Sequence, residues 1–332
     1  MTETRLAIAC LGAGRMGRGI AVAFAYAGHD VTMIDVKSRS VERFAELEAE
    51  ALDEVRKTLA SLTRFGLLDT EQAEAVIARV RIVPSETSAE ALARAGLVFE
   101  GVPEVVELKR EVLAAASRIV DPEVIIASTT STILVDDLSG AITHPERFLN
   151  VHWLNPAYLI PLVEISPGAR TDPAVTERIK SLLEGIGKVP VVCAASPGFI
   201  VPRIQALAMN EAARMVDEGV ATAADIDKAI RYGFGFRYAV LGLLEFIDWG
   251  GGDILYYASR YLEGALGSDR YRAPDVISRN MREGRIGLRT GAGFLDYSGL
   301  DIDAYRDQRL AALVEMLRHF GLARPPASDK RS

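Results

Sequence analysis

The chain is poor in the residues that mark disulfide-stapled and membrane proteins. Its 332 residues include two cysteines, Cys10 and Cys193, and each lies in a short apolar run typical of a β-strand. We therefore expect two buried thiols rather than a disulfide, as in proteins of a reducing cytoplasm. No apolar run approaches the roughly 18 residues that a membrane-spanning helix needs. The first apolar run, Leu6–Leu11, is too short for the core of a signal peptide.

An excess of positive charge is also missing. The 38 Lys and Arg residues against 45 Asp and Glu residues give a formal net charge of −7. Because the basic residues are spread among acidic ones, the sequence excludes an electrostatic footprint for nucleic acid. Hydrophobic residues, in contrast, make up 49% of the chain. That content is enough for one large domain and a smaller one, each with its own core.

Short apolar runs alternate with helical stretches through residues 1–196. This alternation predicts an α/β domain of the Rossmann type, with a mostly parallel, doubly wound sheet. Two amphipathic helices with a break near Phe65-Gly66 form an expected helical insertion at about 38–80. The composition changes at Ser196-Pro-Gly198, and residues 197–332 contain only helical patterns. We therefore expect an all-helical C-terminal domain after the sheet.

A glycine-rich loop follows the first predicted strand and opens the first predicted helix. Its pattern is Gly12-x-Gly14-x-x-Gly17, with Arg15 and Met16 between the last two glycines. The first glycine permits a tight turn, the second lets a pyrophosphate approach the backbone, and the third lets helix and strand pack closely. The phosphates then lie at the helix N-terminus, where free N–H groups and the helix dipole favour anions. The loop therefore predicts a dinucleotide site.

Asp35 ends the second predicted strand, where a carboxylate accepts hydrogen bonds from the adenosine ribose. The same carboxylate repels a 2′-phosphate, so we predict NAD rather than NADP. Lys37 and Arg39 lie nearby and weaken that preference. FAD is the main competing cofactor.

A histidine and a glutamate lie twelve residues apart, with an Asn155-Pro156 turn between them. His152 ends a predicted strand, at the edge where open α/β sheets bind ligands, and Glu164 lies on the next strand. Histidine suits the removal of a hydroxyl proton, and a carboxylate on its other nitrogen fixes the tautomer. The alternative is a structural histidine at a strand end with a surface glutamate. However, Glu164 lies inside an apolar run, where a carboxylate needs a partner.

A hydroxyl-rich segment, Ser128-Thr-Thr-Ser131-Thr, follows another predicted strand on the same edge of the sheet. A hydroxyl at this position can hydrogen-bond a substrate oxygen. The alternative is a Ser or Thr cap before the next helix, and the residues alone leave both interpretations open.

These motifs together resemble the 3-hydroxyacyl-CoA dehydrogenase family along nearly the whole chain. The matching stretches, in order, are Gly12–Ala21, Phe99-Glu-Gly-Val-Pro-Glu104 with Lys109, Ala127–Ser131, His152 with Asn155-Pro156 and Leu162-Val-Glu164, Pro197-Gly-Phe-Ile-Val201, and Thr290–Tyr297. The resemblance implies that His152 is the base, Glu164 its partner and Ser131 a ligand of the substrate hydroxyl.

The same resemblance implies further binding residues and partners. Glu104 and Asn155 would lie near the nicotinamide end of NAD, and Lys109 is a further predicted cofactor-binding residue. A homodimer formed through the C-terminal domain is also implied, and the apolar content of that domain agrees with it. We assign no metal ion to the chain.

The sequence departs from the family pattern at several positions. Pro202 stands where the family has a substrate-binding asparagine, and proline offers neither a side-chain hydrogen bond nor an N–H. His152-Trp-Leu-Asn-Pro and Phe236–Gly242 resemble the branch that includes lambda-crystallin and carnitine dehydrogenase, which acts on free hydroxy acids. A free carboxylate in a water-poor pocket needs a cation, and Arg237 is our candidate. The alternative for Arg237 is a structural arginine in a helix–helix loop.

The leading hypothesis is an NAD-dependent cytoplasmic enzyme that oxidises a small free 3-hydroxy acid to the 3-keto compound. A short acyl-CoA, such as 3-hydroxybutyryl-CoA in fatty acid metabolism, is the alternative substrate, because the 38–80 insertion helps to hold CoA in that family. A crystallin-like protein that binds NADH without catalysis is a further alternative. The His-x-x-Asn-Pro spacing to Glu164 argues against a 6-phosphogluconate-type or 2-hydroxy acid enzyme.

Overall fold

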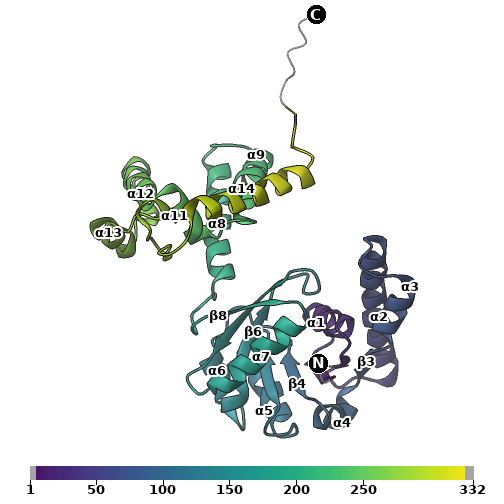
Figure 1. The fold of residues 1–332 in the computed structure, drawn as a ribbon. Coiled ribbons are helices and arrows are strands. Elements are labelled where there is room, and N and C mark those ends of the chain that lie inside the picture. The colour runs from purple at the N-terminus through teal and green to yellow at the C-terminus, as the bar shows by residue number, and fades with distance from the viewer. Residues whose placement is uncertain (1–4, 326–332) are drawn as a thin grey trace, which may run out of the picture. The chain divides into compact units, whose positions relative to one another are not determined.

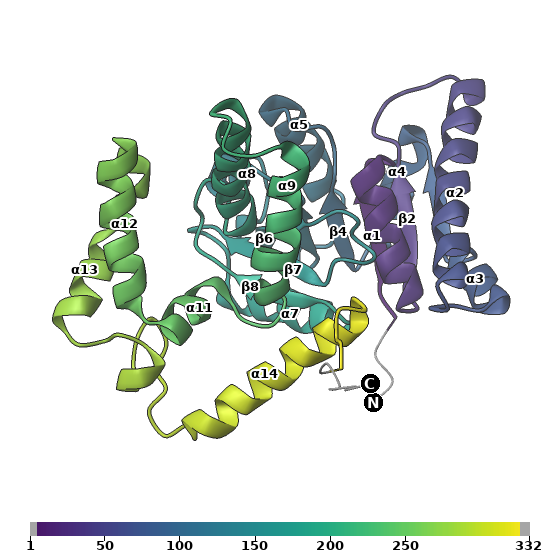
Figure 2. The same cartoon turned by 90° about the horizontal axis from the view of Figure 1, so that it is seen from above.

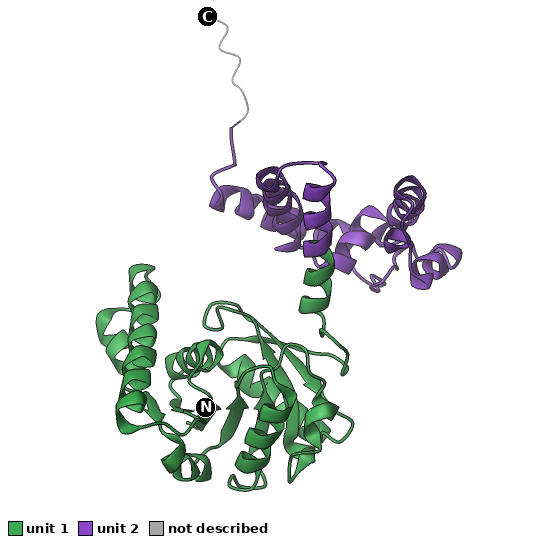
Figure 3. Cartoon of the chain, turned by 180° about the vertical axis from the view of Figure 1, so that it is seen from behind, with its two compact units in different colours: residues 1–208 green, residues 209–332 purple. Residues whose placement is uncertain are grey.

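The structure is a computed structural model that describes residues 5–325. The chain forms two compact units, residues 1–208 and residues 209–332 (Figure 3). The first unit contains the whole sheet, and the second is helical (Figure 1).

One eight-stranded sheet forms the centre of the first unit. Its strands are β1 (Ala7–Leu11), β2 (Asp30–Ile34), β3 (Val80–Val83), β4 (Leu97–Glu100), β5 (Ile125–Ser128), β6 (Phe148–Trp153), β7 (Leu162–Pro167) and β8 (Val189–Val192). Their order across the sheet is β3-β2-β1-β4-β5-β6-β7-β8. Every neighbouring pair is parallel except β6 and β7, which are antiparallel. The strand order reverses at β1 and β4, which is the position where doubly wound sheets bind ligands.

Helices cover both faces of this sheet. They are α1 (Arg15–Tyr26), α2 (Val41–Arg64), α3 (Thr70–Ile77), α4 (Ser88–Ala93), α5 (Val106–Ser117), α6 (Val135–Ser139) and α7 (Pro173–Gly185). A further helix, α8 (Val201–Asp217), has no buried residue and runs from the first unit into the second. One buried cluster joins the sheet to α1, α2, α3 and α7, and a second joins it to α4, α5 and α6. The central strands are buried on both sides, which explains their continuous apolar runs. The predicted doubly wound Rossmann sheet is therefore confirmed.

The expected helical insertion consists of α2 and α3, which lie side by side next to α1 (Figures 1 and 2). Ser40 caps α2, since its side chain accepts a hydrogen bond from the Arg43 N–H. The predicted break follows Arg64, where Gly66 adopts a φ of +74°. The buried face of α2 carries Ala51, Val55, Leu59 and Leu62, so the insertion packs on α1 rather than standing free.

The second unit is helical, as predicted. Its helices are α9 (Ala223–Ala229), α10 (Phe236–Tyr238), α11 (Leu243–Gly250), α12 (Gly252–Leu266), α13 (Asp275–Arg282) and α14 (Ile302–His319), with a π-helical turn at Ile230–Gly235. α14 contains no buried residue, so much apolar side-chain surface of this unit is exposed. Among residues 5–325, no helix is long and apolar enough to cross a membrane.

One expectation about the cysteines is wrong. Cys10 lies in β1 and is buried, and its burial raises the pKa of the thiol to about 12. Cys193 is partly exposed, because it follows β8 at the edge of the sheet. Neither thiol is in a disulfide. An apolar run such as Val189–Val192 does not by itself distinguish an edge strand from a central one.

Candidate active site

The antiparallel pairing of β6 and β7 brings the predicted acid/base pair together. His152 and Glu164 are direct partners in the strand register, so their side chains extend from the same face of the sheet. The His152 Nδ1 lies 2.8 Å from the Glu164 Oε2, and both side chains are buried. The twelve-residue spacing is thus the length of chain that leaves β6 at His152, turns, and brings Glu164 on β7 back opposite His152.

The second carboxylate oxygen of Glu164 accepts two backbone hydrogen bonds. The Ile200 and Val201 N–H groups donate to Oε1 at 2.9 and 2.8 Å, where α8 begins. Burial alone raises the pKa of Glu164, but the hydrogen bonds from His152, Val201 and Ile200 outweigh it and hold the pKa below its ordinary value. Glu164 is therefore a carboxylate near neutral pH, and it accepts the His152 Nδ1–H.

Phe199 is a residue of this site that the sequence analysis did not single out. Its ring stacks on the His152 imidazole, with 5.3 Å between centroids and 22° between planes. Its φ of +46° lies in the left-handed region that L-residues rarely adopt. The preceding Pro197-Gly198 pair was the only signal, since it announces a turn before α8. The turn orients both the Phe199 ring and the two N–H groups that bind Glu164.

A cleft of about 350 Å³ opens beside His152. Its walls are Arg15, Met16, Gly101, Val102, Glu104, Lys109, Thr129, Ser131, His152, Trp153, Leu154, Asn155, Pro202 and Gln205. The cleft therefore brings together His152, Ser131 and most of the predicted cofactor residues. Pro202 lies in the first turn of α8, a position that tolerates proline because the N–H there has no intrahelical partner.

Glu104 fixes the hydroxyl-rich segment that follows β5. Its Oε1 accepts hydrogen bonds from the Ser131 and Thr132 N–H groups at 3.1 Å each, and from the Thr132 and Thr130 hydroxyls. Burial raises the pKa of Glu104, but the Thr130 hydrogen bond and the Lys109 charge lower it below the ordinary value. Ser131 does not cap α6, since Leu134 occupies that position. Its hydroxyl has no hydrogen-bond partner in the described part of the chain.

Lys109 lines the cleft, but its ammonium group is engaged inside the protein. It donates to both oxygens of Glu100 at 2.9 and 3.1 Å and to the Val102 carbonyl at 3.1 Å. It also lies 3.3 Å from Glu104. Glu100, which is fully buried at the end of β4, also accepts hydrogen bonds from the Val102 N–H at 2.7 Å and from the Ser128 hydroxyl at 2.6 Å. Glu100 was not among the site residues predicted from the sequence. A charged residue ending an apolar strand was its only signal.

The glycine loop has the geometry that a dinucleotide needs. Gly12 adopts a φ of +107°, and a Cβ on Gly17 would lie 2.2 Å from the Gly12 carbonyl oxygen. A Cβ on Gly14 would meet nothing within 4 Å, so the space in front of the N-terminus of α1 is open. These features fit a pyrophosphate bound by the loop and by the first N–H groups of α1.

Asp35 lies directly after β2, at the position where a carboxylate that binds the adenosine ribose is expected. It is buried, and it already has two partners: the Lys37 N–H donates to Oδ1 at 3.2 Å and the Arg39 Nε to Oδ2 at 2.5 Å. Of the two nearby cations, Lys37 and Arg39, only Arg39 directs its side chain to the Asp35 carboxylate.

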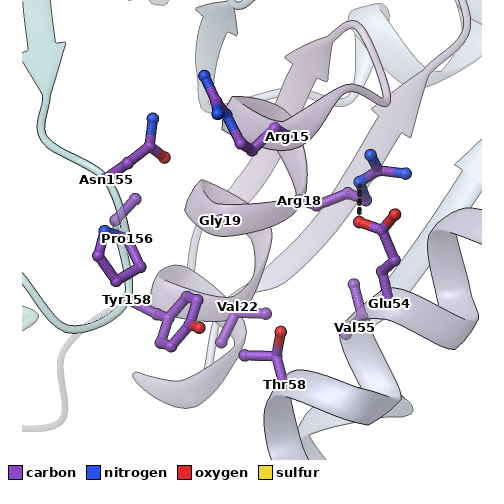
Figure 4. A pocket seen from close by; sticks show the side chains of 11 residues that line it. Arg15, Arg18, Gly19, Val22, Glu54, Val55, Thr58, Asn155, Pro156 and Tyr158 are labelled. Atoms are coloured by element: carbon purple, nitrogen blue, oxygen red, sulfur yellow. Dashed lines mark ion pairs between the residues drawn. The ribbon is translucent and has the colours of Figure 1, made fainter.

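A second pocket of about 320 Å³ adjoins the cleft and shares Arg15 and Asn155 with it. It lies between α1, α2 and the loop after β6 (Figure 4). Arg15 and Asn155 face each other across its opening, and Val22, Thr58 and Tyr158 line its other end. The Arg18 Nε lies 3.1 Å from the Glu54 carboxylate on its α2 side. Arg15, which faces the opening, has no ion-pair partner among residues 5–325.

Arg237 lies in the second unit, in α10. Its Nε donates to the Gly233 carbonyl at 2.9 Å, and its guanidinium stacks over the Phe246 ring, 4.6 Å from the centroid. These contacts stabilise the turn before α10, and the side chain remains exposed.

Comparison with known proteins identifies the family. The profile described as "3-hydroxyacyl-CoA dehydrogenase, NAD binding domain" matches residues 7–196, and that of the C-terminal domain matches residues 198–297. The chain is 30% identical to 5-formyl-3-hydroxy-2-methylpyridine 4-carboxylate 5-dehydrogenase of Mesorhizobium japonicum, over 94% of this chain and 97% of that one. It is 34% identical to lambda-crystallin of Oryctolagus cuniculus, over 76% and 77% of the two chains.

A solved structure gives the same result. The crystal structure of a 3-hydroxyacyl-CoA dehydrogenase from Archaeoglobus fulgidus matches with a TM-score of 0.74 and 30% identity, over 96% of this chain and all of that one. The predicted family, the NAD cofactor and the class of oxidoreductase acting on CH–OH groups are therefore confirmed. The chain belongs to the 3-hydroxyacyl-CoA dehydrogenase family.

Proposed function

We propose that this protein oxidises the 3-hydroxyl group of a small free 3-hydroxy acid to the 3-keto compound, with NAD as the oxidant. The buried pair of His152 and Glu164 at the wall of the cleft carries the proposal, because a base held in one tautomer suits the removal of a hydroxyl proton. Two observations favour a free acid. The Mesorhizobium relative is named for a carboxylate substrate, and Pro202 replaces a side chain that would bind substrate.

The residues of the cleft then act as follows. His152 donates its Nδ1–H to Glu164, which leaves Nε2 as the basic nitrogen. Nε2 takes the proton of the substrate hydroxyl, and the Glu164 carboxylate stabilises the imidazolium that forms. The free hydroxyl of Ser131 donates a hydrogen bond to the same substrate oxygen. Bound NAD supplies the acceptor for the hydrogen and electron pair that leave the substrate C3.

The cofactor is held by residues of the first unit. Pyrophosphate would bind at the glycine loop and the first turn of α1, the ribose at Asp35, and the nicotinamide end near Glu104 and Asn155. The residues that we propose for this role are Gly12, Gly14, Arg15, Met16, Gly17, Asp35, Glu104 and Asn155. Since the Lys109 ammonium is buried against two carboxylates, we propose that it holds Glu104 in place instead of contacting NAD.

The test measures NADH formation with purified protein, using 3-hydroxybutyryl-CoA beside free 3-hydroxybutyrate, gulonate and carnitine. Turnover with a free acid supports the proposal, whereas turnover with the thioester alone would contradict it. His152→Asn should lower kcat by about 10²–10⁴-fold, the usual contribution of a general base. Its NADH affinity, measured by fluorescence, should stay close to that of the wild type. Wild-type turnover in this variant would remove His152 from the mechanism.

A short acyl-CoA is the second candidate substrate. The helical insertion is intact as α2 and α3, and the pocket between α1 and α2 adjoins the cleft at Arg15 and Asn155. The relative from Archaeoglobus fulgidus is named as an acyl-CoA enzyme. Arg237→Met separates the candidates, because it should raise KM for a free acid while leaving KM for a thioester unchanged.

We also propose that residues 1–196 form the NAD-binding domain and that residues 197–332 form a substrate and dimerisation domain. The family profiles meet between residues 196 and 198, in support of this boundary. A homodimer is supported by the exposed apolar side chains of the second unit. The cytoplasm is the proposed location, and two thiols outside any disulfide agree with it.

A further inference from the structure

We propose that Arg39 is a masked ligand for a 2′-phosphate, and that Asp35 sets the cofactor preference by occupying it. Asp35 would then exclude NADP in two ways, by repelling the phosphate and by neutralising the cation that would bind it. This inference rests on the proposed position of the adenosine ribose at Asp35, and it identifies Arg39 as a second determinant of cofactor specificity.

The contact between the two side chains carries the inference. The Arg39 Nε lies 2.5 Å from the Asp35 Oδ2, while the other carboxylate oxygen accepts the Lys37 N–H at 3.2 Å. The Asp35 side chain is 7% exposed and that of Arg39 is 32% exposed. A partly desolvated, charge-assisted hydrogen bond is stronger than a surface ion pair. In the described part of the chain, Asp35 is the only anion that pairs with Arg39.

The chemistry of the arginine fits a phosphate better than the ribose of NAD. A guanidinium offers five donors in a planar fork that binds phosphate oxygens in pairs. Next to Asp35 the charge of the Arg39 guanidinium is balanced, so this side chain offers an approaching 2′-phosphate little net attraction. Without the carboxylate, the same guanidinium would become an uncompensated cation beside the ribose 2′ position, which is where arginine accommodates this phosphate in NADP-binding folds.

The backbone around the pair is held by contacts that do not need the Asp35 carboxylate. The Asp35 N–H donates to the Val83 carbonyl at 2.9 Å, and Ser40 caps α2 through the Arg43 N–H. A serine at position 35 can still accept the Lys37 N–H in a local turn. We therefore expect Asp35→Ser to remove the charge while the 35–40 loop keeps its path.

The experiment measures binding of two nucleotides by titration calorimetry, without any substrate turnover. The probes are 5′-AMP and adenosine 2′,5′-bisphosphate, which differ only in the 2′-phosphate. The wild type should prefer 5′-AMP. In Asp35→Ser the affinity for the bisphosphate, relative to 5′-AMP, should rise by about tenfold to a hundredfold, as expected for hydrogen bonds to a charged group.

A second substitution distinguishes an unmasked arginine from the simple loss of repulsion. Asp35→Ser with Arg39→Met should lose most of the gain. The matched control is Asp35→Ser with Arg43→Met, because Arg43 pairs with Glu46 at the surface, and it should keep the gain. A full gain in the Arg39→Met double variant would overturn the proposal, and so would no gain in Asp35→Ser.

Two further outcomes are also decisive. If Asp35→Ser does not fold, as judged by circular dichroism, the isosteric Asp35→Asn replaces it and should show a smaller gain that again requires Arg39. Unchanged affinities of all variants for both nucleotides would overturn the proposal by showing that the ribose is not at Asp35. Because no substrate is present, none of these results depends on whether a free acid or an acyl-CoA is oxidised.

Discussion

At the scale of single residues, the site depends on how the Glu164 carboxylate is kept charged. It lies in an apolar strand, where an unpartnered carboxylate would be costly. Three donors stabilise it: the His152 ring and the Ile200 and Val201 N–H groups. The same contacts that lower its pKa also orient the imidazole, so one set of hydrogen bonds would serve both stability and the proposed catalysis.

Replacement of Glu164 by glutamine should therefore have a pH-dependent effect on stability. The pKa of Glu164 is lower in the folded chain than its ordinary value of 4.5. The unfolded state thus binds the proton first as pH falls, and the stabilisation is complete above about pH 4.5 and lost through the lower folded pKa. The difference in unfolding free energy between wild type and Glu164→Gln should be largest near neutral pH and shrink in acid.

Urea unfolding at a series of pH values from neutral to about 3 measures this difference. Glu177→Gln, on the exposed face of α7, is the matched control and should unfold like the wild type at every pH. A difference for Glu164→Gln that stays constant across the series would show that the carboxylate charge does not contribute. The same variant should also lose activity at neutral pH, because glutamine does not stabilise the imidazolium.

At the scale of elements, two glycines at the junction of β1 with α1, Gly14 and Gly17, have different roles. Gly17 lies where the helix presses on the preceding turn, since its Cβ would overlap the Gly12 carbonyl oxygen. Gly14 has a φ of −78° and open space around it. Gly17 is therefore needed for packing, and Gly14 for the approach of a ligand.

Alanine at each position should separate these tasks. Gly17→Ala should lower the unfolding free energy by about 1–3 kcal/mol, the usual cost of overpacking. Gly14→Ala should change it by less than about 1 kcal/mol, because only a helix cap residue is altered. The Gly14 variant should nevertheless bind NADH about tenfold or more weakly, through the loss of hydrogen bonds to a charged group. Thermal unfolding and NADH fluorescence titration measure the two effects. Equal losses of stability would contradict this assignment.

At the scale of the whole molecule, the sequence predicts what depends on local periodicity and order. The sheet, the insertion with its break near Gly66, and the return of Glu164 to His152 all follow from short patterns. The position of Phe199 does not, because the Pro197-Gly198 pair predicts a turn but not a left-handed conformation in the non-glycine residue that follows it. The Glu100–Lys109 pair was missed for a different reason. The ion pair forms only when the first turn of α5 packs against the end of β4, and neither segment alone shows that contact.

The helical unit leads to a prediction about assembly. α12 exposes Ile254, Tyr257 and Tyr261, whose side chains are 62%, 64% and 73% accessible. Their spacing places them on one face of the helix, and monomeric proteins rarely expose such a continuous apolar stripe. Burial of this stripe in a homodimer would remove it from water and stabilise the unit, which has few buried residues of its own.

Glutamate at positions 257 and 261 should therefore convert a dimer into a monomer, because four charges would face one another across a two-fold axis. Analytical ultracentrifugation at micromolar concentration measures the change. Val41→Glu is the matched control, since Val41 is 81% exposed at the start of α2 in the other unit, and it should sediment like the wild type. A wild-type monomer would rule out the dimer. A double variant that remains dimeric would show that α12 does not form the interface. The exposed apolar side chains of α14 would then be the next to substitute.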